Sequence, residues 1–255
     1  MRNIKLTIAY DGSEFFGWQL QPNLPTVQGW IVDVARKITD EKVMVWGSGR
    51  TDTGAHALGQ VAHFRTRSMI PLENLQRAMN SLLLDTIRIL RVEEVPMEFH
   101  ARWHTLAKTY HYRIFRGRVC SPFQYRYVYP YPFPLDEEAM KRAAKLFEGE
   151  HDFASFASAS EEEGEEGRSK VRLIYRSELM RDDLSEELIY VTRGKGYLRH
   201  MVRKIIGTLL EVGKGKLTVD DIARIFESRD RTKAGPTVPA RGLVLVGVEY
   251  PELCR

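Results

Sequence analysis

The stretch that most constrains the fold is Val43-Met44-Val45-Trp46-Gly47-Ser48-Gly49-Arg50-Thr51-Asp52-Thr53-Gly54-Ala55-His56. Its first four residues form an apolar run typical of a strand, and a loop of glycine and small hydroxyl residues follows. Glycine permits backbone conformations closed to other residues, and loops on a rigid scaffold often carry functional groups. The loop presents one carboxylate, Asp52, two positions after Arg50. Asp52 is therefore a candidate nucleophile, general base or ligand.

Two other interpretations of this loop stay open at this point. The residues around Asp52 also suit a plain turn in which side chains bond to their own backbone. Asp-Thr-Gly is likewise the loop of aspartic proteases, which need two carboxylates sharing one proton. Because the chain contains this tripeptide once, a protease would have to form its pair by dimerisation.

Strand and helix patterns alternate on both sides of the loop. Before residue 100, strands are expected at 3–10, 43–48, 60–66 and 86–95, with helices at 26–39 and 71–84. That order is the split βαβ, ferredoxin-like unit. Later in the chain, strands are expected at 109–116, 170–181, 187–192 and 242–250, with helices at 136–147, 197–212 and 219–228.

This pattern predicts an α+β fold of two ferredoxin-like lobes, each of the βαββαβ type, that share a mainly antiparallel sheet. The expected N-terminal lobe, 1–103, carries the Asp52 loop. The expected C-terminal lobe, 104–255, completes the active site, which we place in the cleft between the lobes.

Composition narrows the class of protein. The 255 residues are 43% hydrophobic and 28% charged, which is ordinary for a soluble globular protein. No apolar run approaches the ~18 residues of a membrane span, so no membrane partner is expected. The two cysteines, Cys120 and Cys254, have neither disulfide nor metal-ligand spacing. We therefore expect a cytoplasmic protein without a metal site or a disulfide framework.

The charge pattern permits a nucleic-acid partner. The net charge is +4, and acidic residues gather in Glu161–Glu166, a run expected to be solvated and to face away from RNA. Lysines and arginines alternate with aromatic residues, among them Tyr110, Tyr112, Phe115, Phe123, Tyr125, Tyr127 and Tyr129. Interleaved cations and rings suit phosphates and stacked bases, although any one of these residues equally suits a half-buried strand.

Ordered motifs cover essentially the whole chain. They are AYDGSEFFGWQ at 9–19, TVQ at 26–28, GRTDTGAHA at 49–57, GQV at 59–61, FHAR at 99–102, YHY at 110–112, GEHDF at 149–153, MVRKIIG at 201–207 and AGPTVPARGL at 234–243. In this set the chain closely resembles the tRNA pseudouridine synthase A (TruA) family. The resemblance implies an isomerase that converts uridine to pseudouridine at positions 38 to 40 of the tRNA anticodon stem-loop. It also implies a homodimer that holds tRNA, and chemistry without a cofactor or a metal.

The resemblance also implies roles for single residues. Asp52 matches the family's essential aspartate and is the expected nucleophile, attacking either the ribose anomeric carbon or uracil carbon 6. Arg203 matches a buried arginine that provides a counter-charge for Asp52. Tyr110 matches a tyrosine that stacks on the target base and takes part in a late proton transfer. Core packing of Tyr110 and an ordinary helix salt bridge of Arg203 are the structural alternatives.

Two further residues are implied to bind substrate. Arg50 is expected to enter the space left by the flipped base, and Leu243 to form an apolar wall beneath the uracil. His56 and His63 have no ligand spacing and are expected to be structural. Trp103 and Lys108 stand where relatives usually carry Phe and Arg, and we assign them to packing and phosphate contact.

Three functions are therefore compared. The first is an RNA-modifying isomerase, the second a tRNA-binding module without chemistry, and the third a dimeric acid protease. The combination of Arg50, Asp52, Tyr110 and Arg203 favours the isomerase, because pure binding needs no such set.

Overall fold

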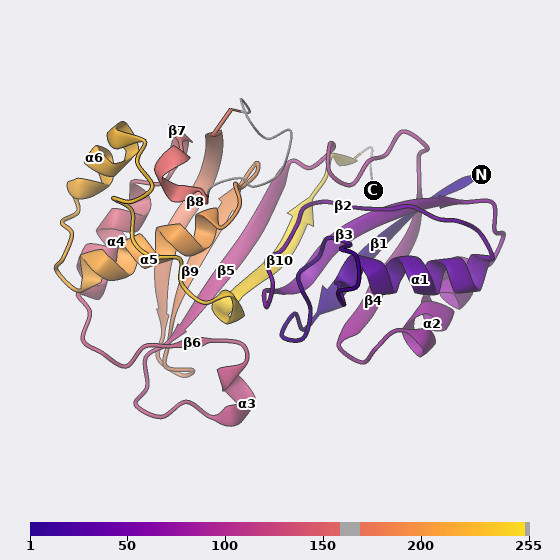
Figure 1. Cartoon of the computed structure of the whole chain (residues 1–255), viewed down its shortest axis with the longest axis horizontal. Coiled ribbons are helices and arrows are strands. Elements are labelled where there is room, and N and C mark those ends of the chain that lie inside the picture. The colour runs from indigo at the N-terminus through magenta and orange to yellow at the C-terminus, as the bar shows by residue number, and fades with distance from the viewer. Residues whose placement is uncertain (159–168, 253–255) are drawn as a thin grey trace. The chain divides into compact units, whose positions relative to one another are not determined.

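The computed structural model describes residues 1–158 and 169–252, and it forms two compact units (Figure 1). The acidic run Glu161–Glu166 and Cys254 lie outside the described residues. Unit 1 consists of Met1–Lys108 and the segment from Val244 onward, and unit 2 of Thr109–Leu243. The chain passes from unit 1 to unit 2 within β5 (Ala107–Phe115) and returns within β10 (Leu243–Glu249).

These units divide the chain at other residues than the expected lobes, 1–103 and 104–255. The last strand, β10, belongs mostly to unit 1 because Val244 and Leu245 pair in parallel with His56 and Ala57 of β3 (His56–Thr66). Such a pairing joins residues far apart in the sequence, so the local pattern around either strand carries no signal for it.

Unit 1 contains a mainly antiparallel sheet with two helices. Its strand order is β4-β1-β3-β10, and β2 pairs with β3. The bounds are β1 Arg2–Tyr10, α1 Val27–Thr39, β2 Val45–Gly47, β3 His56–Thr66, α2 Leu72–Leu82 and β4 Ile87–Val95. Both β3 and β4 are antiparallel to β1. These elements match the expected ones in type and order, with ends that shift by a few residues.

The core of unit 1 follows from its apolar periodicity. Ile4, Leu6 and Ile8 of β1 are fully buried. Helix α1 begins where the sequence predicts, because the Thr26 hydroxyl accepts a hydrogen bond from the Gly29 amide. A second cluster contains Val61, Val95, Phe99, Ala101 and Tyr250. The sheet of unit 1 therefore carries buried apolar residues from β1, β3 and β4.

Strand β3 begins at His56, earlier than the expected start at residue 60. The reason is again β10, which lies beside the first residues of β3. A Cβ atom at Gly59 would lie 2.6 Å from the Val246 carbonyl oxygen, so glycine allows this close approach.

Unit 2 contains a second mainly antiparallel sheet with its own helices. The strand order is β5-β9-β8-β7, and β6 pairs with β5. The bounds are α3 Pro122–Tyr125, β6 Tyr129–Pro130, α4 Glu137–Lys145, β7 Gly149–Asp152, η1 Ala154–Phe156, β8 Val171–Asp182, β9 Glu187–Gly194, α5 Met201–Gly213, α6 Asp221–Ser228 and η2 Ala240–Gly242. The short elements α3, β6, β7, η1 and η2 are additions to the sequence prediction.

Helix α5 begins at Met201 and not at the expected Tyr197. The residue before it, His200, has a φ of 60°, a left-handed conformation that interrupts helical geometry. Helix α5 is almost entirely buried, and it packs on α4 within unit 2. The later start places Arg203 in the first turn of α5.

The mixed α+β class expected from the sequence is confirmed, with mainly antiparallel pairing in each unit. Among the described residues, no helix combines the length and apolar character needed to cross a membrane.

Candidate functional site

The Asp52 loop, residues 47–55, is closely packed against the segment that follows β1. Gly17 has a φ of 83°, and a Cβ atom there would lie 2.6 Å from the Thr51 carbonyl oxygen. A Cβ atom at Gly12 would lie 1.9 Å from the Ala55 carbonyl oxygen. Both glycines are therefore required by close backbone approach. The motif AYDGSEFFGWQ and the motif GRTDTGAHA form two sides of one local structure.

Hydrogen bonds fix the backbone on both sides of Asp52. The Trp18 amide donates to the Thr51 carbonyl at 3.2 Å, and the Ala55 amide donates to the Asp52 carbonyl at 3.0 Å. The hydroxyls of Tyr10 and Thr51 lie 2.7 Å apart. Burial raises the pKa of Tyr10 to about 12, so its hydroxyl stays protonated at neutral pH. The half-buried Asp52 is thus carried on a backbone with little freedom.

The start of the loop is held by polar side chains. The Ser48 hydroxyl donates to Gln60 Oε1 at 2.7 Å, and Gln60 Nε2 donates to the Gly49 carbonyl at 3.0 Å. Lys108 Nζ donates to the Ser48 carbonyl at 2.5 Å. Burial, with a smaller contribution from Arg102, lowers the pKa of Lys108 to about 8. Lys108, which the sequence assigned to phosphate contact, reaches the loop backbone directly.

Arg50 occupies the same loop as Asp52, as the sequence requires. Its side chain is exposed, and its Nε donates to Gln19 Oε1 at 3.1 Å. The structure therefore brings Arg50 and Asp52 together on one loop of unit 1, with Arg50 on the surface.

The two histidines near the loop have structural contacts, as expected. The Gly12 amide donates to His56 Nδ1 at 3.1 Å, and the Ala101 amide donates to His63 Nδ1 at 3.2 Å. Burial lowers the pKa of His63 to about 4, so this ring is neutral. Across residues 1–158 and 169–252, no group of three or more His, Cys, Asp or Glu side chains is placed to hold a metal ion.

In unit 2, Tyr110 lies on β5 with its ring 6% exposed. Its ring meets that of Tyr197 edge to face, with centroids 5.0 Å apart. Tyr112, on the same face of β5 as Tyr110, is fully buried, and its hydroxyl donates to the Pro239 carbonyl at 2.8 Å. Tyr110 and Tyr112 therefore lie on one buried face of β5, as the alternating sequence pattern predicts.

Arg203 and Leu243 border the segment that carries the AGPTVPARGL motif. Arg203 Nε donates to the Val238 carbonyl at 2.7 Å. A Cβ atom at Gly207 would lie 1.7 Å from the Pro236 carbonyl oxygen, so α5 and the motif are in close contact. Leu243, 6% exposed, ends this segment and begins β10. The motif and the start of α5 form one packed structure within unit 2.

The five residues singled out by sequence thus fall into two groups. Arg50 and Asp52 belong to unit 1, whereas Tyr110, Arg203 and Leu243 belong to unit 2. Their catalytic and binding roles stay predictions. Sequence reasoning did not assign Tyr10 or Lys108 to the Asp52 loop, because the contacts that join them to it come from residues far apart in the chain.

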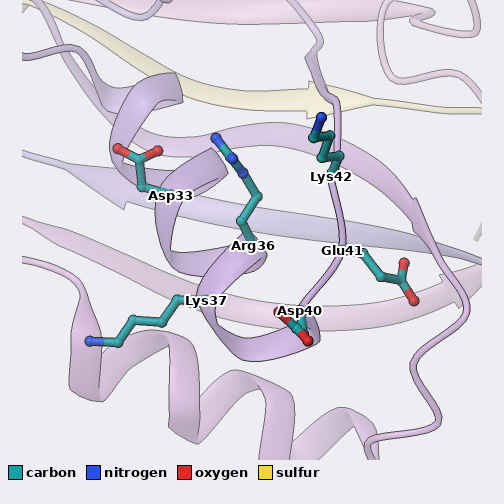
Figure 2. Close-up of a pocket in the computed structure, with 6 residues that line it drawn as sticks. All are labelled: Asp33, Arg36, Lys37, Asp40, Glu41 and Lys42. Atoms are coloured by element: carbon teal, nitrogen blue, oxygen red, sulfur yellow. The ribbon is translucent and has the colours of Figure 1, made fainter.

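A surface hollow lies elsewhere in unit 1, around the end of α1. Figure 2 shows its lining side chains on α1 and on the segment after it: Asp33, Arg36, Lys37, Asp40, Glu41 and Lys42. Acidic and basic groups are balanced there, so the hollow has no clear preference for an anionic ligand. None of the five predicted site residues lines it.

Comparison with known proteins gives a consistent assignment. The family model described as tRNA pseudouridine synthase matches residues 6–104 and 143–251. The chain is 50% identical over 250 residues to tRNA pseudouridine synthase A of Solibacter usitatus, and this match covers 98% of this chain and 100% of the relative. It is 48% identical, with the same coverage, to tRNA pseudouridine synthase A of Caldicellulosiruptor saccharolyticus.

A solved archaeal box H/ACA sRNP Nop10-Cbf5 complex is also similar, with a TM-score of 0.36 and 12% identity over 91% of this chain and 60% of that one. A likeness this distant supports no argument about function. The assignment rests instead on the family-model match and on the full-length identity to the curated relatives. They show that the chain belongs to the tRNA pseudouridine synthases, the isomerases that convert uridine in tRNA to pseudouridine.

Proposed function

We propose that this protein isomerises uridine at positions 38 to 40 of the tRNA anticodon stem-loop, with Asp52 as the nucleophile. The observation that carries the proposal is the Asp52 loop, whose backbone is held by Trp18 and the glycines behind it, and whose Thr51 hydroxyl is hydrogen-bonded to that of Tyr10. A carboxylate must be presented in one geometry to attack a carbon atom, and a fixed loop provides this. The motif match to the A-type synthases supports the choice of tRNA positions.

The reaction is an internal rearrangement. The base separates from the ribose, turns, and rejoins through carbon 5, whose hydrogen is then lost to solvent. Asp52 attacks as a carboxylate, either at the anomeric carbon or at uracil carbon 6. The covalent intermediate divides one difficult step into two easier ones.

We infer that residues of both units act on the same uridine. In this scheme Tyr110 stacks on the base and takes part in the final proton transfer, and Arg203 provides the counter-charge that keeps Asp52 ionised. Leu243 offers the uracil an apolar wall. Arg50, exposed beside Asp52, enters the gap left by the flipped base.

The finer architecture belongs to the same proposal. Both units are proposed to be ferredoxin-like lobes of one catalytic fold, and in unit 1 the order β4-β1-β3 with β2 on β3 supports this. The active enzyme is proposed to be a cytoplasmic homodimer. Light scattering at working concentration tests the assembly, and a monomer that turns over tRNA contradicts it.

The primary experiment measures tritium release from tRNA labelled at carbon 5 of its uridines. Asp52→Asn keeps the shape of the side chain but removes the nucleophilic charge, so turnover should fall by more than about 10³-fold. Binding of tRNA, measured by filter retention, should stay close to that of the wild type. Asp33→Asn is the matched control, because Asp33 is an exposed carboxylate of the same unit.

Two outcomes are decisive. Normal turnover by Asp52→Asn removes Asp52 from the chemistry. Pseudouridine found outside positions 38 to 40, mapped by sequencing the product, leaves the isomerase assignment intact but corrects its target.

The affinity for tRNA should also weaken steeply with salt if the protein contacts phosphates, and a titration from low to high salt checks this.

A further inference from the structure

Lys108 links the strand that carries Tyr110 to the loop that carries Asp52. It is the second residue of β5, two positions before Tyr110, and its Nζ lies 2.5 Å from the Ser48 carbonyl oxygen. A Cβ atom at Gly49 would lie 2.6 Å from the same Nζ, so the ammonium group is seated directly against the loop backbone. The contact involves unit 1 alone, because Lys108 is the last residue of its first segment.

Keeping a cation at this place has a cost. Burial and, to a smaller extent, repulsion by Arg102 together lower the pKa of Lys108 to about 8, so the surroundings disfavour the charged form. An apolar side chain of similar length would avoid that penalty. The charge therefore requires a role that outweighs its effect on folding.

The neighbours of Lys108 indicate what that role is. Ser48 and Gln60, which complete the hydrogen-bond network, are neutral. The ionisable groups of the adjoining segments include Arg102 and His104, which precede β5, Arg50 and Asp52 of the loop, and Glu249 of the neighbouring strand β10. A charge-assisted hydrogen bond is about twice as strong as a neutral one, and it holds the carbonyl that precedes Gly49 and Arg50.

We propose that Lys108, in its charged form, is a positioning residue of the isomerisation: its ammonium group holds the Ser48 end of the Asp52 loop in the reactive geometry. The proposal rests on the proposed role of Asp52. Lys108 acts through the loop backbone, so its effect falls on kcat more than on tRNA binding.

Stability and activity should change in opposite directions with pH. The folded state loses the Lys108 proton near pH 8, whereas the unfolded chain keeps it up to the ordinary lysine pKa. Between these values the unfolded state binds more protons, so the Lys108 contribution to stability rises with pH. In the proposal, the same deprotonation weakens the hold on the loop. Above pH 8, activity therefore falls while the contribution of Lys108 to stability rises.

The experiment compares Lys108→Arg and Lys108→Met with the wild type in tritium release at saturating tRNA from pH 7 to 9.5. The wild-type kcat should fall above pH 8. Lys108→Arg should lack that decline, because a guanidinium keeps its charge in this range. Lys108→Met should lose about 10- to 100-fold in kcat at pH 7.5, with a KM for tRNA close to that of the wild type.

Gly49→Ala supplies an independent test, because its new methyl group displaces the Lys108 ammonium without changing the lysine. Its kcat should fall as well. Gly247→Ala is the control, since a Cβ atom there meets nothing within 4 Å.

An alkaline decline shared by the wild type and Lys108→Arg overturns the proposal, and so does a wild-type kcat for Lys108→Met. If Lys108 had only a structural role, the pH profile of kcat would have the same shape in the wild type and in Lys108→Arg. Failure of the Asp52 assignment is seen separately, as turnover by Asp52→Asn, so the two results are distinguishable.

Discussion

The Asp52 loop and the segment 117–135 of unit 2 both carry arginine, but they differ in composition and in packing. The loop joins Arg50 to glycines and small hydroxyl residues, whereas the segment joins Arg118 and Arg126 to aromatic residues and prolines. In the Asp52 loop, Ser48 and Thr51 are buried and their carbonyls accept hydrogen bonds from Lys108 and Trp18. In the segment 117–135, which contains α3, the side chains of Val119 and Phe123 are 83% and 91% exposed.

The difference in packing separates a loop suited to hold a reacting group from an exposed surface segment. A reacting group needs a backbone held from several directions, whereas an exposed ring can adapt to whatever it meets. The following predictions test whether the two regions are as different in energy as in packing.

The largest effect on the fold should come from Gly12→Ala. The added Cβ would lie 1.9 Å from the Ala55 carbonyl oxygen, so the backbone must move. We expect the free energy of unfolding, measured by urea denaturation, to fall by about 3 kcal/mol. We also expect a large decrease in kcat, because the Asp52 loop shifts. Gly247→Ala, with no neighbour within 4 Å, should be close to the wild type in both assays. A stable, active Gly12→Ala would mean that the loop is less constrained than the contacts indicate.

The Tyr10–Thr51 hydrogen bond should have a smaller, pH-dependent effect. Tyr10→Phe leaves the buried Thr51 hydroxyl without this partner, which should lower stability by about 1–2 kcal/mol at pH 7. The pKa of Tyr10 is raised to about 12 in the folded state, so the unfolded chain loses this proton first. The Tyr10 contribution is then complete below pH 10 and is lost as pH rises toward 12.

Urea denaturation of both proteins at pH 7 and at pH 11 checks this sign. The gap between the wild type and Tyr10→Phe should narrow at pH 11, because phenylalanine has no proton to lose. A gap that widens would show that another group controls the alkaline behaviour.

The sequence predicted the local elements well, and its omissions have a common cause. Helix α1 and its Thr26 cap were readable because both signals lie within one turn of each other. The early start of β3, the place of β10 and the contact from Lys108 to Ser48 depend on residues separated by many positions. Asp52 was found through its motif. The side chains that hold its loop belong to no motif of this loop, so they are identified only by their contacts in the structure.

In the segment 117–135, Tyr125 makes a contact with Arg241. The Arg241 guanidinium lies 4.2 Å from the centroid of the Tyr125 ring. A cation–π contact at a partly exposed site contributes about 0.5–1 kcal/mol, so Tyr125→Ala should lower the free energy of unfolding by that amount. Tyr125→Phe keeps the ring and should behave as the wild type. Equal losses in both variants would assign the effect to the hydroxyl instead.

The smallest effect should come from Phe123→Ala, at the most exposed ring of the same segment. Because the ring is already 91% in solvent, its removal gives up almost no buried apolar surface, and the melting temperature should change by no more than about 1–2 °C. Thermal unfolding monitored by circular dichroism measures this beside Gly12→Ala. If Phe123→Ala instead destabilised the protein as strongly as Gly12→Ala does, the exposed segment would be part of the folded core, and exposure would not separate it from the Asp52 loop. If Phe123→Ala leaves the melting temperature unchanged, Phe123 makes no contribution to folding that explains why a large apolar ring is exposed to water. The two regions then differ in energy as well as in packing.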